Sequence, residues 1–258
     1  MKRTLITPAL SVFPECFHSL LTGSPVFDSS CSPEARVWYI EKDCGFYLKA
    51  APKGTLKREA EMAGYFHSKG LGPEVVRYES QERDWLLTVQ VQGEDCTYTR
   101  YLEDPMRLSA LLGERLRQLH ETDSTGCPGW DKISLYLDTA RKNYEAGKCY
   151  LPSFPTAANG EEAWRYVQEN VSRLDTTTLI HGDFCLPNIM LDDWQFSGFI
   201  DVGGGGLGDR HIDLHWGAWS LGYNLGTDTY RDRFLDAYGR DVINEDIFPI
   251  IGAFEVFG

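Results

Sequence analysis

Three oxygen-bearing side chains occur in an order and at a spacing that suit phosphoryl transfer. Asp183 lies in the run HGDFCLPN at residues 181–188, Asn188 ends that run, and Asp201 follows thirteen residues later. One carboxylate can orient an attacking hydroxyl, and an amide and a second carboxylate are oxygen ligands that suit Mg²⁺. Asp183 alone could equally be a turn residue, but the ordered set predicts a catalytic carboxylate at Asp183 and a metal site at Asn188 and Asp201.

The residues between the two metal ligands must form the element that positions them. Residues 189–191 and 196–200 alternate or cluster apolar side chains and predict two short strands, with a turn at Asp192-Asp193 between them. Such a hairpin would deliver Asp201 to the other side of the metal from Asn188.

Bulk composition fits a soluble globular protein. The chain has 258 residues, of which 42% are hydrophobic and 24% charged, and this length supports one large domain or two small lobes. No apolar run approaches the roughly 20 residues of a membrane span, and Pro8 and Pro14 interrupt the N-terminal apolar stretch, so we expect no membrane segment and no signal peptide. Seven cysteines without a Cys-x-x-Cys pair indicate reduced thiols in a cytoplasmic protein.

The charge of the chain is acidic and unevenly placed. The formal net charge is −13, and residues 181–258 hold 13 acidic but only four basic side chains. We therefore do not expect nucleic acid as a partner, because binding it needs a basic footprint. An acidic C-terminal part would attract cations, including polycationic small molecules, although a solvated surface is the simpler explanation of many charged runs.

The first part of the chain has the pattern of a small antiparallel sheet. We expect strands at residues 36–40, 46–49, 75–78 and 85–91, and a fifth near Val26 and Phe27, because β-branched and aromatic residues alternate there between turn residues. Residues 56–68 predict a helix with an apolar face, which ends at Gly70-Leu71-Gly72-Pro73.

Beyond a hinge expected at residues 92–95 the pattern becomes helical. Helices are predicted at residues 108–121, 131–146, 161–174, 211–221, 230–238 and 245–257, with a loop at 147–160. We therefore predict an α+β fold of two lobes: an antiparallel β lobe at residues 1–92 that binds a nucleotide, and a larger helical lobe at residues 93–258 that carries catalysis and substrate binding.

These motifs together resemble the protein-kinase-like fold and, within it, the aminoglycoside phosphotransferase family, particularly its 3′-phosphotransferases. The resemblance covers most of the chain, and it is carried by the stretches FYLK at 46–49, REA at 58–60, LRQLH at 116–120, HGDFCLPN at 181–188, FSGFIDVG at 196–203 and EVF at 255–257. A protein kinase would have Arg where this chain has Gly182.

The resemblance implies a role for each matching residue and implies ATP and Mg²⁺ as cofactors. Lys49 would contact the ATP phosphates and pair with Glu59, Asp183 would orient the acceptor hydroxyl, and His181 and Asp213 would hold the catalytic loop. Asn188 and Asp201 would bind Mg²⁺, and Glu255 would bind the substrate. The residues implied for the nucleotide also include Ser29, Ser30 and Ser32 in a phosphate loop, and Val89 and Val91 at adenine. Taken singly, Lys49 and Glu59 read as an ordinary strand-end lysine and a solvated helix residue, and the serines equally as a solvated turn.

Three departures from the family pattern leave the acceptor open. Gly204 stands where the family usually has Arg, residues 148–160 contain no Asp or Glu, and Tyr223-Asn224 replaces an acidic pair. We expect a small-molecule kinase that phosphorylates the 3′-hydroxyl of a cationic aminoglycoside, as a monomer or homodimer. The alternatives are a kinase of the same fold for a less cationic hydroxyl compound, and a nucleotide-binding protein without transferase activity.

Overall fold

The computed structural model describes residues 3–31, 33, 35–129 and 131–258. By its internal contacts the chain divides into two compact units, and the chain passes between them three times. The first unit comprises residues 1–95 and 187–203, and the second comprises residues 96–186 and 204–258. The predicted hairpin therefore belongs to the first unit, although it comes late in the sequence.

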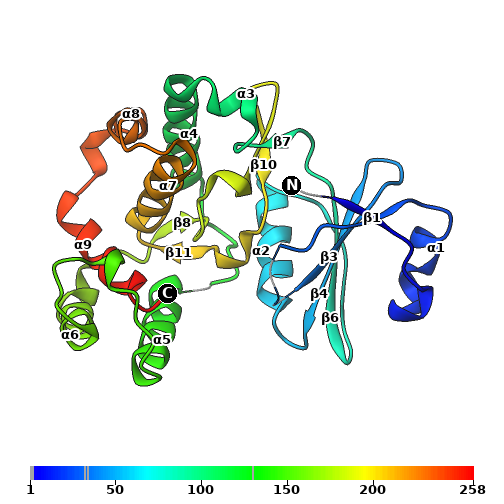
Figure 1. Cartoon of the computed structure of the whole chain (residues 1–258), viewed down its shortest axis with the longest axis horizontal. Helices are drawn as coiled ribbons and strands as arrows, with labels where there is room; N and C mark the ends of the chain where they lie inside the picture. Colours follow the sequence, from blue (N-terminus) through cyan, green and yellow to red (C-terminus); the bar gives the residue numbers. More distant parts are fainter. Residues whose placement is uncertain (1–2, 32, 34, 130) are drawn as a thin grey trace. The chain divides into compact units, whose positions relative to one another are not determined.

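The first unit is built on a six-stranded antiparallel sheet, one strand more than predicted (Figure 1). The additional strand is β1, whose three residues were too few to give a period. In spatial order the strands are β1 (Thr4–Ile6), β2 (Val26–Asp28), β3 (Arg36–Ile40), β4 (Phe46–Pro52), β6 (Arg83–Val89) and β5 (Val75–Ser80). The prediction that β6 continues to Val91 was wrong, because the pairing of β4 with β6 ends at Phe46 and Val89.

Both faces of this sheet are covered. On one face Trp38 and Trp85 stack at 5.8 Å between ring centroids beneath Phe13 and Phe17, which come from the segment around α1 (His18–Leu21). On the other face α2 (Lys57–Ser68) packs near the sheet, and Leu56, at its start, is buried with Leu86 (Figure 1). The alternation of side chains along each strand thus supplies two separate apolar layers.

A second, three-stranded sheet completes the first unit. Its order is β10 (Gln195–Phe199), β9 (Ile189–Asp192) and β7 (Glu94–Asp95). The hairpin is confirmed, with its turn one residue later than predicted, at Asp193 and Trp194, both of which have positive φ. The predicted hinge at 92–95 ends in β7 because Glu94 and Asp95 pair with Leu191 and Met190.

The second unit is mainly helical. Its elements are α3 (Thr99–Leu102), α4 (Pro105–His120), α5 (Lys132–Glu145), α6 (Gly160–Asn170), β8 (Thr178–Ile180), β11 (Gly206–Gly208), α7 (Arg210–Leu225), α8 (Arg231–Tyr238) and α9 (Phe248–Glu255). Side chains of Asp104, Asp131, Asn159 and Asp209 cap the starts of α4, α5, α6 and α7, as expected of short oxygen-bearing side chains at N-caps.

Two predicted helices are shorter than expected. The helix predicted at 161–174 ends at Asn170 and continues as a 3₁₀ turn at Val171–Arg173. The helix predicted at 245–257 begins only at Phe248, after a 3₁₀ turn at Glu245–Ile247, because Pro249 fits the first turn of a helix but not its interior. None of the helices that the structure describes is both long and apolar enough to cross a membrane.

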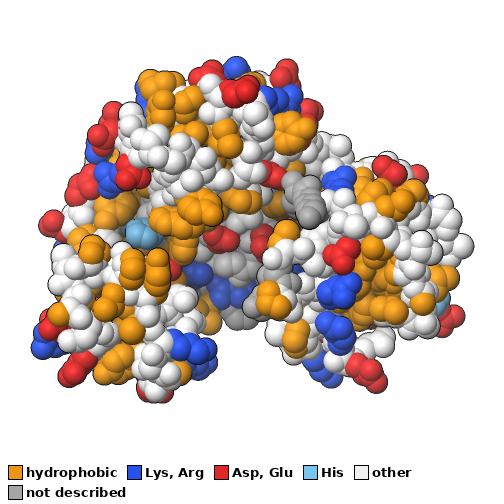
Figure 2. All heavy atoms as spheres, in the orientation of Figure 1, with side chains coloured by type: hydrophobic (Ala, Val, Ile, Leu, Met, Phe, Trp, Pro, Cys, Tyr) orange, Lys and Arg blue, Asp and Glu red, His pale blue; other side chains and the backbone are white. Residues whose placement is uncertain are grey.

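The surface of the first unit is not uniformly polar. Figure 2 shows hydrophobic side chains gathered in the region of β1 and α1, and Leu5, Leu10 and Val12 are among the exposed large hydrophobic residues.

The fold class is as predicted: antiparallel β structure in the first unit and helices in the second.

Candidate active site

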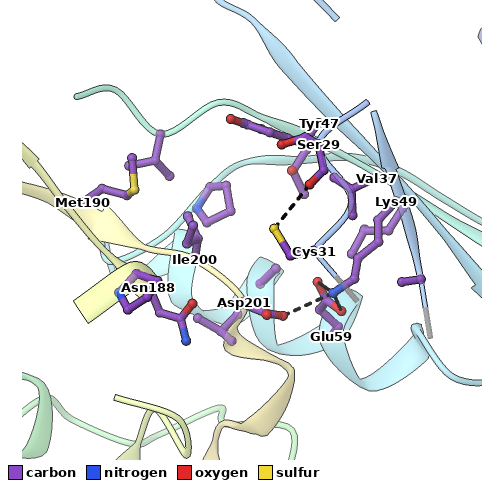
Figure 3. Close-up of a pocket in the computed structure, with 18 of the residues that line it drawn as sticks. Ser29, Cys31, Val37, Tyr47, Lys49, Glu59, Asn188, Met190, Ile200 and Asp201 are labelled. Atoms are coloured by element: carbon purple, nitrogen blue, oxygen red, sulfur yellow. Dashed lines mark hydrogen bonds and ion pairs between the residues drawn. The ribbon is translucent and has the colours of Figure 1, made fainter. Parts of the chain in front are cut away.

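The first unit contains a pocket of about 320 Å³ whose lining unites most of the predicted nucleotide residues (Figure 3). Ser29, Lys49, Glu59, Val89, Val91, Asn188 and Asp201 all line it. They come from the strands of the large sheet, from α2 and from the ends of the late hairpin. Lys49 and Asp201, 152 positions apart in sequence, thus meet within one compact unit.

Lys49 is the electrostatic centre of this pocket. Its Nζ donates to Glu59 at 3.0 and 2.8 Å and to Asp201 Oδ1 at 3.2 Å (Figure 3). Burial alone would lower the pKa of Lys49, but the charges of Glu59 and Asp201 outweigh it and raise the pKa. Lys49 is therefore a cation throughout the physiological range.

Glu59 is held for this role by its place in the first turn of α2. Its burial raises the pKa of its carboxyl, against the effect of Lys49. Glu59 is thus mainly a fixed support for the lysine, whereas Asp201, with 56% of its side chain exposed, still has surface to offer a ligand.

The hairpin positions Asn188 and Asp201 at its two ends. The Ile200 N–H donates to the Asn188 carbonyl at 2.9 Å, and the Phe199 N–H donates to the Leu71 carbonyl at 2.7 Å. A register shift between Phe196 and Gly198 marks a β-bulge, a device that redirects the following side chains. Asp201 itself has φ +55°, an uncommon conformation for a non-glycine residue that often marks a functional position.

An amide oxygen and a partly exposed carboxylate in one pocket fit Mg²⁺, which keeps several waters and shares phosphate oxygens rather than filling an all-protein cage. Among the described residues no group of three or more His, Cys, Asp and Glu could hold a metal.

The predicted serine loop is only partly directed at the pocket. Ser29 lines it, while the Ser30 hydroxyl accepts from the Val37 N–H at 3.0 Å and does not belong to the lining. Ser32 lies outside the described residues. Of the two valines predicted at adenine, Val89 has its N–H already engaged: this group donates to the Glu74 carbonyl at 3.0 Å.

Sequence reasoning missed part of the lining, including Tyr47, Thr88, Met190 and Ile200. Tyr47 could have been found, because it lies two residues before Lys49 in β4 and side chains two apart share a face of a strand. Met190 could not, since its place depends on the pairing of β9 with β7.

In the second unit, the backbone ahead of Asp183 is held by a buried carboxylate. Asp213 on α7 accepts from the N–H groups of His181 and Gly182, both at 2.7 Å. Gly182 has φ +79°, and a Cβ at this position would overlap the Gly204 carbonyl, so only glycine fits. His181 is fully buried, with its Nδ1 3.3 Å from the Asp183 nitrogen, which agrees with the structural role expected for it.

A buried chain of side chains supports Asp213 in turn. His120 Nε2 lies 3.2 Å from Asp213 Oδ2, and His120 Nδ1 lies 2.8 Å from the Tyr238 hydroxyl. Because a carboxylate only accepts, Nε2 carries the proton and Nδ1 accepts from Tyr238. Burial lowers the pKa of His120 despite Asp213, and hydrogen bonds lower the pKa of Asp213 despite its burial. We therefore infer that His120 is neutral and that Asp213 is ionised.

Glu255, the predicted substrate residue, is the last residue of α9. Burial raises the pKa of its carboxyl to about 7, and Lys132 opposes the shift only in part. The site residues thus fall into two groups: those of the pocket in the first unit, and Asp183 and Glu255 in the second.

A kinase-type arrangement in the first unit and a braced aspartate loop in the second define a phosphotransferase, and the comparisons with known proteins agree. The model of the phosphotransferase enzyme family matches residues 33–247. The chain therefore belongs to the phosphotransferase enzyme family.

The relatives found by sequence have more specific names than the family as a whole. The chain is 48% identical over 250 residues to a "Probable aminoglycoside 3'-phosphotransferase" of Lactococcus lactis subsp. lactis, covering 95% of each chain. It is 28% identical over 206 residues to an aminoglycoside 3'-phosphotransferase of Niallia circulans, covering 78% of this chain and 79% of the relative.

Solved structures share the fold. An aminoglycoside-3'-phosphotransferase of type VIII is similar with a TM-score of 0.77 at 24% identity, covering 92% of this chain and 94% of its own. An aminoglycoside phosphotransferase of Streptomyces rimosus, in complex with ADP and streptomycin, is similar with a TM-score of 0.74 at 20% identity, covering 98% and 100%.

Proposed function

We propose that this phosphotransferase uses ATP and Mg²⁺ to phosphorylate the 3′-hydroxyl of an aminoglycoside and thereby confers resistance. The observation that carries the proposal is Lys49 held between Glu59 and Asp201 in the lining of a pocket that Asn188 also lines. The 48% identical relative and the ADP complex of the Streptomyces rimosus structure support the substrate class and the nucleotide.

Each residue has a defined task in this proposal. Lys49 binds phosphate oxygens as a point charge on a flexible stem, and Asn188 and Asp201 hold the metal. The Asp183 carboxylate orients the acceptor hydroxyl and accepts its proton. Mg²⁺, when bound, offsets the negative charge on the phosphates.

The remaining nucleotide residues surround these. In this proposal the segment from Val89 to Val91 offers backbone groups to the adenine, and Ser29 and Ser30 belong to the loop that reaches the phosphates; Ser32, also proposed for this role, lies outside the described residues. Ser29 contributes through its position in the lining, whereas the Ser30 hydroxyl stabilises the loop by its bond to Val37. We further propose that the unit at residues 1–95 and 187–203 binds the nucleotide and that the unit at residues 96–186 and 204–258 carries Asp183 and the acceptor. We also propose a cytoplasmic location and a monomer or homodimer.

A less cationic hydroxyl acceptor is the second candidate, and one observation favours it. The loop at 148–160 contains no carboxylate. It belongs to the second unit, where the Tyr150 N–H anchors it by donating to the Val256 carbonyl at 2.7 Å. A site for polyamines should present several carboxylates, and this loop supplies none.

A coupled ADP-release assay tests both candidates. The panel contains kanamycin, neomycin and neutral polyols, with Mg²⁺-ATP in excess. Turnover on the aminoglycosides supports the proposal, and turnover on neutral compounds alone contradicts it. If Mg²⁺-ATP stabilises the protein while no acceptor is phosphorylated, the chain is a nucleotide-binding protein without transferase activity.

A further inference from the structure

An arginine ahead of β1 is joined to the wall of the pocket that the proposed function assigns to the nucleotide. The Arg3 guanidinium donates from Nη2 to the Tyr47 hydroxyl at 2.6 Å, and its central carbon lies 3.4 Å from the centroid of the Tyr39 ring. Tyr39 and Tyr47 are partners in the pairing of β3 with β4, and their ring centroids are 5.2 Å apart. One cation therefore contacts both members of a cross-strand aromatic pair.

Tyr47 is the member of this pair that lines the pocket (Figure 3). It shares a face of β4 with Lys49, two residues further along. In β6 its partner is Thr88, the residue before Val89. Tyr47 is therefore displaced from Lys49 towards the segment proposed for adenine.

The two tyrosines differ in how firmly they are held. Tyr39 is only 7% exposed and has the Phe27 ring 5.9 Å away, so its position is fixed by packing. Tyr47 is only partly buried, and among the residues that the structure describes Arg3 is the one hydrogen-bond partner of its hydroxyl. Because this bond is made at the far end of the ring, it restricts both side-chain torsions of Tyr47.

Strand β1 does not need this contact to stay in the sheet. Its residues pair with residues 26–28 of β2, and Ile6 packs on the apolar layer that contains Trp38 and Trp85. The backbone next to Arg3 is thus placed by the strand pairing and by Ile6. The contacts of the Arg3 side chain act on the two tyrosines instead.

We propose that Arg3 is a positioning residue of the nucleotide pocket, which fixes the Tyr47 ring in the pocket wall before the nucleotide binds. This inference rests on the proposed function, since it takes the pocket to be the nucleotide site. Arg3 is not among the residues that line the pocket, so it acts through Tyr47 and not by contact with a phosphate. A wall that is ordered in advance lowers the entropic cost of binding, so Arg3 increases the affinity for the nucleotide.

A double-mutant cycle tests this path. Arg3→Met keeps an unbranched apolar stem and removes the guanidinium, and Tyr47→Phe keeps the ring and removes the hydroxyl. Wild type, the two single variants and the double variant are compared by the Kd of Mg²⁺-ADP in calorimetry and by the Tm of the free protein. The matched control is Arg77→Met, at an arginine of the same sheet that donates to Glu79 and is not part of the pocket lining.

We expect Arg3→Met and Tyr47→Phe each to raise the Kd about three- to tenfold, the loss of one hydrogen bond, and Arg77→Met to leave it unchanged. In the Arg3→Met background, Tyr47→Phe should have almost no further effect, because the bond is already absent. Independent losses that multiply in the double variant would overturn the proposal. So would a lower Tm at an unchanged Kd, which is the pattern of a residue that only stabilises the first unit.

Tripolyphosphate separates positioning from simple charge attraction. It has the phosphates of the nucleotide without the nucleoside, and its Kd is measured by competition with Mg²⁺-ADP. If Arg3 acts through Tyr47, Arg3→Met should leave the Kd of tripolyphosphate unchanged. If the Arg3 charge attracts the phosphates, the loss should be as large as for ADP, and that result overturns the positioning role.

These measurements need no acceptor, so they stand apart from the test of the aminoglycoside. Where turnover is found, the KM for ATP should follow the Kd in each variant, while kcat and the KM of the acceptor stay unchanged. Binding of Mg²⁺-ADP without ADP release on any aminoglycoside refutes the proposed acceptor, whereas the Kd cycle still judges Arg3. If wild type does not bind Mg²⁺-ADP, the nucleotide site is refuted, and the positioning role with it.

Discussion

The stability of the free protein should depend on pH through Glu255, and Glu255→Gln should remove that dependence. Burial raises the pKa of this carboxyl from 4.5 to about 7 in the folded protein. A raised pKa means that the folded state binds the proton more tightly than the unfolded state. The contribution of Glu255 is therefore full below pH 4.5 and is lost as the pH rises through about 7.

The magnitude follows from the two pKa values. A tenfold difference in proton affinity corresponds to about 1.4 kcal/mol, so the interval from 4.5 to about 7 corresponds to about 3 kcal/mol in total. Of this, about 2.5 kcal/mol falls between pH 5 and pH 8. Glutamine does not titrate, so the variant lacks this loss.

The assay is urea denaturation at pH 5, 6, 7 and 8, followed by circular dichroism, on wild type and Glu255→Gln. We expect the free-energy difference between variant and wild type to shift by about 2.5 kcal/mol in favour of the variant from pH 5 to pH 8. The matched control is Glu245→Gln, at a surface carboxyl paired with Arg231 and Arg240, which should show no such trend. Parallel pH profiles for wild type and Glu255→Gln would refute the reasoning that Glu255 is desolvated in the free protein.

Four further variants test the rest of the site. Asp183→Ala should lower kcat by about 10²- to 10⁴-fold and leave the calorimetric Kd of Mg²⁺-ATP unchanged, so unaltered turnover would contradict its assignment. Asp201→Ala should weaken Mg²⁺-ATP binding in the same titration, and equal affinity would exclude it as a metal ligand. Gly182→Ala should destabilise the protein by about 2 kcal/mol or more in urea, because alanine at positive φ meets the Gly204 carbonyl; full stability would count against that approach. Tyr238→Phe should cost about 1–3 kcal/mol in urea, because it leaves buried His120 Nδ1 without its donor; an unchanged midpoint would show that the bond is absent.

The sequence was informative where chemistry is local. The apolar runs at residues 189–191 and 196–200, with a turn between them, predicted a hairpin, and the structure contains it as β9 and β10. Strand β3 has the predicted bounds, because alternation and a glycine turn define it within a few residues. Lys49 and Glu59, which carried no signal singly, are paired at 2.8 Å.

The features that escaped prediction depend on contacts between distant segments. The residue types of Glu94 and Asp95 do not predict a strand, because β7 forms only by pairing with Leu191 and Met190. The bond between His120 and Tyr238 joins residues 118 positions apart. The contacts of Arg3 with Tyr39 and Tyr47 likewise form only after β1, β3 and β4 have joined one sheet.

The late position of the β9–β10 hairpin has a consequence for biosynthesis. The first unit includes residues 187–203, so it lacks a sheet edge and both proposed metal ligands until most of the chain has left the ribosome. Domains made early can normally fold early during translation. Here the nascent unit must wait, and the β7 backbone stays unpaired until β9, its partner in the sheet, has been made. A fragment that stops at residue 95 would therefore be an incomplete body prone to aggregation, and a functional excised nucleotide unit would need residues 187–203 spliced onto it.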